Sequence, residues 1–211
     1  MYNLPHYKEH DPQVILDFIR HHPFAMLIGC DRNRPVATQV PFIAEERNGT
    51  LYLLGHIMKK QDHQLAFEQN PEALVVFTGP HTYVSATWYA DPHQASTWNY
   101  MSVHLRGVLR FLDEEGLRLV LQKLTLHFEN NNQHSSTVFH NLAEDYNNRL
   151  MKSIIAFEIE TREIDHVFKL SQNRDEQSFH QIIDQLSSRE ADAKIIAGEM
   201  KKRSKKLFQD K

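Results

Sequence analysis

Short apolar segments separated by frequent turns occupy the first half of the chain, and they restrict the possible folds more than any other feature. The residues Asn48-Gly49 between two of these segments are a strong signal for a β-hairpin. The segments do not alternate regularly with helices, so we expect an antiparallel barrel and not a doubly wound parallel sheet. Strands are predicted at Phe24–Cys30, Val36–Ala44, Thr50–His56 and Ala73–Thr78, with further extended segments at Tyr83–Tyr89, Trp98–Leu112 and Ile154–Leu170.

Helix-forming patterns lie around these strands and fill the end of the chain. Asp11 and Pro12 suit the N-cap and first position of a helix that ends at Pro23. The predicted fold class is mainly β with peripheral helices (α+β). No linker divides the sequence, so we expect a single domain over residues 1–211 with a helical appendage at about 175–211. Further helices are predicted at Gln61–Gln69, Glu114–Asn130, Phe139–Met151 and from Glu176 onward.

Composition excludes several classes of protein. The formal net charge is −3, so the chain as a whole has no electrostatic attraction to nucleic acid or to anionic lipid. The single cysteine, Cys30, rules out a disulfide within the chain, and its apolar neighbours predict a buried thiol. The N-terminus does not resemble a signal peptide, and no apolar run approaches the length of a membrane span. We therefore expect a cytoplasmic protein that does not enter a membrane.

Three polar-aromatic clusters, at residues 79–89, 97–100 and 169–173, contain both tryptophans of the chain. Aromatic faces can stack on a flat ligand while amides and hydroxyls bond to its edges. Along a strand Trp98 and Tyr100 would share one face and Asn99 the other, so a dimer interface is needed to use all three. The alternative to a ligand site is that these residues form an aromatic core or a dimer interface. The candidate site residues from these clusters are Tyr83, Ser85, Thr97, Trp98, Asn99, Tyr100, Lys169, Ser171, Gln172 and Asn173.

A fourth candidate is the basic segment Lys59-Lys60-Gln61, where a predicted strand gives way to a helix. Lysines near a helix N-terminus suit a phosphate, because charge and free backbone N–H groups act together. The alternative is a solvated basic pair. A glycine-rich phosphate loop is absent from the sequence.

The remaining polar features predict less. The fourteen histidines lack the spacing of a metal site, so no metal is expected, and no catalytic residue can be assigned. The basic run 201–206 could contact nucleic acid, but basic residues at a helix C-terminus also complement the helix dipole. We favour the second interpretation.

A series of motifs extends along nearly the whole chain, and in these motifs it resembles the PaiB-type family of FMN-binding negative transcriptional regulators. The resemblance implies a split β-barrel of the flavin-reductase and pyridoxamine-phosphate-oxidase type. It also implies a homodimer with FMN in a cleft between subunits. The motifs are Pro5-His6-Tyr7 with Asp11, Pro23-Phe24-Ala25, Gly55-His56, Phe77–Ser85, Trp88-Tyr89, Thr97–Tyr100, Val103-His104, Phe157-Glu158-Ile159 and Lys169–Arg174.

By this resemblance the four candidate segments match the family's FMN-binding positions, with Lys59 at the basic position after Gly-His. The implied function is an FMN-binding protein with a regulatory or sensing role. Three alternatives stay open: a flavin-dependent oxidoreductase acting on a small molecule, a haem-binding or haem-degrading split barrel, and a regulator that binds DNA directly.

Overall fold

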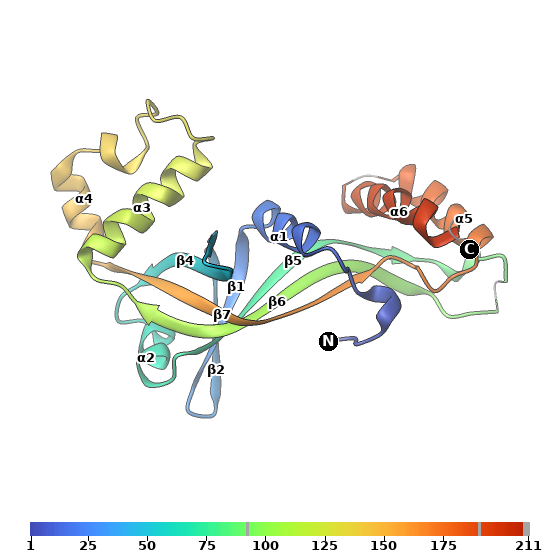
Figure 1. Cartoon of the computed structure of the whole chain (residues 1–211), viewed down its shortest axis with the longest axis horizontal. Coiled ribbons are helices and arrows are strands. Elements are labelled where there is room, and N and C mark those ends of the chain that lie inside the picture. Colours follow the sequence, from blue (N-terminus) through green and yellow to red (C-terminus); the bar gives the residue numbers. More distant parts are fainter. Residues whose placement is uncertain (92, 190, 209–211) are drawn as a thin grey trace. The chain divides into compact units, whose positions relative to one another are not determined.

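The computed structural model describes residues 1–91, 93–189 and 191–208 (Figure 1). Contacts within the chain define two compact units. Unit 1 contains Met1–Phe18, Thr78–Val103 and the residues from Asp165 onward, and unit 2 contains Ile19–Phe77 and His104–Ile164.

In the described residues seven strands form one sheet in the order β2-β1-β5-β6-β7-β4-β3. Strand β1 pairs antiparallel with β2 and β5, and β4 pairs antiparallel with β3 and β7. The sheet is open, with β2 and β3 at its edges, and the predicted antiparallel α+β class is confirmed. The strands are β1 (Phe24–Asp31), β2 (Arg34–Pro41), β3 (Ile43–Arg47), β4 (Thr50–Met58), β5 (Glu72–Val84), β6 (Thr97–Phe111) and β7 (Ile154–Lys169).

Two glycine positions fix the backbone of unit 2. Asn48 and Gly49 join β3 to β4 with φ angles of 52° and 80°, the left-handed pair that a tight hairpin turn needs, so the predicted hairpin is confirmed. At Gly107 of β6 a Cβ atom would overlap the carbonyl oxygen of Glu160 in β7. Only glycine allows the two strands to approach this closely.

Several predicted strand boundaries were wrong. The predicted strand Val36–Ala44 is two strands, because Phe42 leaves the ladder and donates its N–H to the carbonyl oxygen of Pro23 at 2.8 Å. Strand β5 continues through Gly79-Pro80 to Val84, beyond the predicted end at Thr78. Cys30 is half-buried, not buried, because it lies one residue before the end of β1.

Two further segments differ from the prediction for local reasons. Tyr83–Tyr89 is not extended throughout, because the hydroxyl of Ser85 accepts a hydrogen bond from the Thr87 N–H and starts the short 3-10 helix η2 (Ala86–Trp88). The predicted helix Phe139–Met151 is divided into η3 (Phe139–Asn141) and α4 (Glu144–Met151).

The helices of unit 2 cover a compact apolar core. Helix α2 (Asp62–Gln69) lies against β1 and β2. Helix α3 (Glu114–Phe128) is capped at its N-terminus by Asp113, whose carboxylate accepts a hydrogen bond from the Gly116 N–H. The buried cluster comprises Leu54, Leu117, Val120, Leu121, Leu124, Phe139, Met151 and Ala156.

Two helices of unit 1 follow the C-terminal end of β7. Helices α5 (Glu176–Ser187) and α6 (Asp192–Phe208) lie side by side (Figure 1) and bury Phe179, Ile182 and Met200. The N-terminal segment forms η1 (Pro5–Tyr7), and α1 (Pro12–His21) follows it. In the described residues no helix is long and apolar enough to cross a membrane.

A chain of alternating charges stabilises the sheet of unit 2. The carboxylate of Glu158, on β7, forms ion pairs with Arg47 at 2.9 Å and with Arg110. Arg47 also pairs with Glu45, which forms an ion pair with Lys123 of α3.

Burial alone would raise the pKa of Glu158, but the hydrogen bonds from Arg47 and Arg110 lower it. This carboxylate therefore stabilises the fold above the pKa of unfolded glutamate, and the stabilisation is lost as pH falls through its folded value.

We predict that Glu158→Gln lowers the free energy of unfolding at neutral pH by about 1–3 kcal/mol, because a neutral amide cannot hold two guanidinium groups. Urea denaturation followed by far-UV circular dichroism measures the change. The matched control is Glu163→Gln, which removes an exposed pair with Arg106 and should cost at most about 1 kcal/mol. Equal losses in the two variants would contradict the prediction.

Candidate functional site

Two of the predicted clusters meet in unit 1, at the start of β6 and the end of β7. The ammonium group of Lys169 donates hydrogen bonds to the carbonyl oxygen of Trp98, at 2.9 Å, and to the Thr97 hydroxyl. Asn99 is the next residue of β6, and its side-chain oxygen accepts a hydrogen bond from the Ser171 hydroxyl at 3.0 Å. Segments 97–100 and 169–173 are thus in direct contact.

The two faces of β6 differ as strand alternation predicts. Asn99 is fully buried, and its amide group donates to the sulfur of Met200 on α6 at 3.6 Å. Trp98, on the opposite face, is 53% exposed. Ser171 is buried and has a left-handed backbone with φ of 62°, which turns the chain so that its hydroxyl reaches Asn99. Asn99 and Ser171 therefore hold the fold together.

The exposed face carries three neighbouring aromatic rings, which we call the aromatic surface of unit 1: His81, Tyr83 and Trp98. The ring centroid of Trp98 lies 5.9 Å from that of Tyr83, edge to face, and 6.2 Å from that of His81. Tyr83 is 44% exposed. Exposed rings in this arrangement offer stacking area to a planar ligand.

The late polar motif is mostly engaged with the chain itself. The Gln172 side chain accepts from the Leu170 N–H at 2.7 Å and donates to the carbonyl oxygen of Phe168 at 2.6 Å. Asn173 is exposed, and its side-chain oxygen accepts from the Tyr7 hydroxyl at 3.3 Å. Of the amides in segments 97–100 and 169–173, Asn173 is the one that lies at the surface.

Tyr100 and Ser85 have local neighbours. Tyr100 is half-buried, and burial raises its pKa, with further contributions from Tyr2 and Tyr7 of the N-terminal segment. The Ser85 hydroxyl lies 2.8 Å from that of Thr87 and caps η2.

Lys169 is the candidate cation of this site. Burial lowers the pKa of its ammonium group, and the positive charge of Arg174 lowers it further. An anion bound beside it would replace the lost hydration and favour the charged form.

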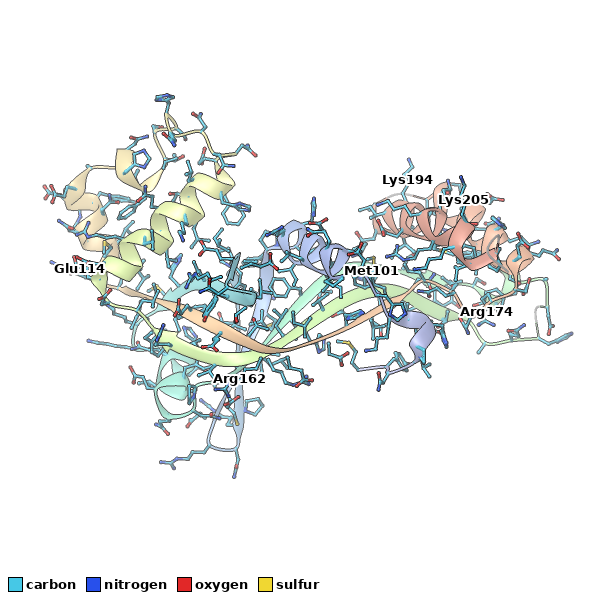
Figure 2. The ribbon with its side chains drawn as sticks, in the orientation of Figure 1. Met101, Glu114, Arg162, Arg174, Lys194 and Lys205 are labelled. Carbon is cyan, nitrogen blue, oxygen red and sulfur yellow. The ribbon has the colours of Figure 1, made fainter. Side chains whose placement is uncertain are left out.

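Sequence reasoning did not select Arg174 as a site residue, although it lies in the same motif. Its guanidinium group lies 4.1 Å from the ring centroid of Tyr89 and donates to the side chain of Gln94. Figure 2 labels Arg174 beside the loop that joins β5 and β6. Cation–π contact anchors this loop.

The N-terminal segment was also missed, because its partners are more than 150 residues away in sequence. Lys8 forms an ion pair with Asp165 at 2.5 Å, and Glu9 forms one with Arg203 of α6 at 3.0 Å. The Glu9 N–H donates to the Nε2 atom of His166 at 2.8 Å. This last bond requires Nε2 to be unprotonated.

The segment Lys59-Lys60-Gln61 belongs to unit 2 and immediately precedes α2. The Lys59 ammonium group donates to the carbonyl oxygen of Met151 at 3.3 Å. Lys60 has a left-handed backbone, and its N–H donates to the Gln64 side chain at 2.6 Å. Gln61 is the N-cap of α2 without a capping side-chain bond, so the predicted position at a helix start is observed.

Among residues 1–91, 93–189 and 191–208, no group of three or more His, Cys, Asp or Glu side chains is arranged to hold a metal ion.

The basic run 201–206 includes Lys205 and Lys206 in the last turn of α6, where they complement the helix dipole. Arg203 is already paired with Glu199 and Glu9.

Comparison with known proteins identifies the family. Residues 1–163 match the family model described as "Putative FMN-binding domain". The chain belongs to this family. It is 29% identical to the protease synthase and sporulation protein PAI 2 of Bacillus subtilis (strain 168) over 211 residues, which cover 98% of this chain and 99% of the relative. The resemblance to the PaiB-type family is confirmed.

Solved structures agree on the fold. The conserved hypothetical protein Rv2991 from Mycobacterium tuberculosis matches with a TM-score of 0.57 and 12% identity, covering 80% of this chain and 91% of that chain. The FAD and heme binding protein from Mycobacterium smegmatis matches with a TM-score of 0.56 and 17% identity, covering 76% and 72%. With the open antiparallel sheet, these matches establish the split β-barrel with C-terminal helices.

We predict that the burial of the His166 ring makes stability fall at acidic pH. Burial lowers the pKa of His166, and the charge of Lys8 lowers it further. As pH falls below about 6.5, the unfolded histidine binds a proton before the folded one does, so folding is opposed by up to about 1.4 kcal/mol per pH unit.

The measurement is urea denaturation from pH 8 to 5 for the wild type and for His166→Gln, whose side-chain oxygen can still accept from the Glu9 N–H. The wild type should lose more stability toward acid than the variant. His56 of unit 2, whose pKa is also lowered by burial, contributes equally to both curves. Parallel curves would rule out the titration of His166 as the cause.

Proposed function

We propose that this chain binds FMN at the meeting point of β6 and β7 in unit 1 and acts as a regulatory or sensing protein of the cytoplasm. The carrying observation is the contact of the partly desolvated Lys169 ammonium group with Thr97 and Trp98, beside exposed aromatic rings. The family match supports a flavin as the ligand. When bound, a flavin supplies one- and two-electron redox chemistry, which suits a sensor as well as an oxidoreductase.

The residues present fit a phosphorylated flat heterocycle in their chemistry. Trp98 and Tyr83 offer exposed rings to the heterocycle, and Lys169 offers positive charge to the phosphate. Asn99 and Gln172 already use their amide groups within the chain, so Asn173 is the better candidate for the hydrogen-bonding edge of the ring. Thr97 and Ser85 add half-buried hydroxyl groups.

We further propose that the functional protein is a homodimer and that both units form one split-barrel domain over residues 1–211, with the helical appendage at about 175–211. The rings of Trp98 and Tyr83 are exposed, so a second subunit would cover the side of a stacked ligand that one chain leaves open. Lys59, Lys60 and Gln61 remain proposed phosphate-binding residues, because they precede α2 as a phosphate site requires.

The regulatory role rests on the relation to PAI 2, and direct contact with DNA is not part of the proposal. In α6 two of the basic side chains, Lys202 and Arg203, are paired with Glu199. The Mycobacterium smegmatis protein is described as binding heme as well as FAD, but it shares only the fold with this chain. A haem absorption titration and a test for flavin reduction by a nicotinamide donor with turnover separate these alternatives.

We predict that the purified protein binds FMN with micromolar or tighter affinity, measured by quenching of flavin fluorescence. Lys169→Met and Trp98→Ala should each weaken binding about tenfold or more, because they remove a charge-assisted contact and a stacking surface. The matched control is Lys194→Met, which removes one exposed positive charge from α6 and should bind as the wild type does. Absence of binding at high micromolar FMN would end the proposal.

We predict that sedimentation equilibrium gives a mass near twice that of the 24.8 kDa chain, with one FMN bound per chain. If the ligand is enclosed by both subunits, dilution into monomers should release it. A monomer that keeps full FMN affinity would contradict the interfacial site.

A further inference from the structure

The N-terminal segment of unit 1 is fastened to β7 and α6 by charged side chains. We call residues 5–11 the strap, and they run beside the last residues of β7 (Figure 1). The Lys8 ammonium group forms an ion pair with Asp165 of β7 at 2.5 Å. The Glu9 carboxylate forms one with Arg203 of α6 at 3.0 Å, and these two side chains are only 16% and 17% exposed. A pair this well buried resists separation, because each partner alone would be a buried charge.

The residue before Lys8 connects the strap to the proposed flavin site. Tyr7 is buried, and its phenol donates a hydrogen bond to the side-chain oxygen of Asn173 at 3.3 Å. The Tyr7 ring also packs edge to face against His6, with the ring centroids 4.1 Å apart. Asn173 is the amide proposed above to bond the edge of the flavin. The bond from Tyr7 orients this amide and leaves its NH2 group to donate to a carbonyl oxygen of the heterocycle.

One further bond of the strap depends on protonation. The Nε2 atom of His166 accepts the Glu9 N–H at 2.8 Å and lies 3.1 Å from the Glu9 carbonyl oxygen. The His166 ring is half-buried and lies against Phe168, with the ring centroids 5.7 Å apart. A neutral imidazole can accept at Nε2, whereas a protonated one carries a hydrogen on both nitrogens. Protonation of His166 therefore removes the acceptor of the Glu9 N–H.

The surroundings of His166 oppose its protonation while the strap is fastened. Burial lowers the pKa of His166 most, and the positive charge of Lys8 lowers it further. The carboxylates of Asp165 and Glu9 act in the opposite direction, and Glu9 is also paired with Arg203 of α6. Release of the strap would expose the ring to water and move Lys8 away, so the released form binds a proton more readily. The fastened form is therefore favoured at neutral pH and loses this advantage as pH falls below about 6.5.

We propose that the strap holds Tyr7 against Asn173 and so keeps the flavin site in its binding form, and that proton uptake by His166 releases it. Tyr7 is a positioning residue in this scheme, because it acts on the ligand through Asn173. The inference rests on the proposed function and adds the regulation of that site. Flavin affinity is highest at neutral pH and falls toward acid, so the protein responds to proton concentration as well as to flavin.

The first test measures FMN binding to the full-length protein at pH 7.5 and 5.5 by quenching of flavin fluorescence. A phosphate monoester also titrates in this range, so the wild type is compared with His166→Gln. Glutamine keeps an acceptor for the Glu9 N–H and cannot gain the proton. The wild type should lose about fivefold more affinity than the variant, within the limit of about tenfold per pH unit that one proton sets. Equal losses in the two proteins would overturn the proposal.

The Tyr7→Phe variant tests the positioning contact without changing His166. It keeps the buried ring and removes the phenol, so FMN binding at pH 7.5 should weaken about fivefold, as expected for the loss of one neutral hydrogen bond. Its loss of affinity toward pH 5.5 should shrink to that of His166→Gln, because strap release no longer affects Asn173. The matched control is Tyr146→Phe, which removes an exposed phenol from α4 of unit 2 and should bind as the wild type does. Wild-type affinity in Tyr7→Phe would contradict the proposal.

Hydrogen exchange of residues 1–11, followed by mass spectrometry, reports the strap in the absence of flavin. After correction for the intrinsic effect of pH on exchange, protection of this segment should fall between pH 7.5 and 5.5 in the wild type and persist in His166→Gln. Unchanged protection in the wild type would overturn the release step. If the wild type binds no FMN at pH 7.5, the proposed function fails and its regulation fails with it. FMN binding that is the same in the wild type and both variants refutes the strap alone.

Discussion

One buried amide, that of Asn99, sets the geometry on which unit 1 depends. An amide removed from water must keep its hydrogen bonds, and Asn99 keeps them through Ser171 and the sulfur of Met200. These bonds connect β6 to the turn after β7 and to α6. Because side chains alternate along a strand, the burial of Asn99 places Trp98 on the exposed face. The burial of Asn99 therefore determines both the packing of unit 1 and the exposure of Trp98 in the candidate site.

The order of strands and helices was largely readable from the sequence, because it follows from apolar periodicity and from turn residues such as Asn48-Gly49. The boundaries depended on contacts that periodicity does not encode. Phe42 leaves the ladder for the Pro23 carbonyl, and Ser85 caps a 3-10 turn in a segment that alternates like a strand. Gly79-Pro80 looked like a stop signal, yet β5 continues through it.

The sequence predicts which segments contribute to the candidate site, but not which side chains in those segments are free to bind a ligand. The sequence selects the segments around Trp98 and Lys169, and the structure brings them into contact within one chain. Which amides are available is a matter of burial, and the structure leaves Asn173 at the surface while Asn99 and Gln172 bond within the chain. Contacts of the N-terminal segment, such as that between Glu9 and His166, join residues too distant in sequence for any local pattern to indicate them.

The distribution of a few rare side chains has a practical consequence. Both tryptophans of the chain lie in unit 1, whereas the single cysteine of the chain, Cys30, lies in β1 of unit 2. The half-buried Cys30 thiol is a unique attachment point for an acceptor dye. With Trp88 replaced by phenylalanine, Trp98 becomes a single natural donor. Resonance energy transfer between these two positions would then report the separation of the two units in solution with only two changes to the chain.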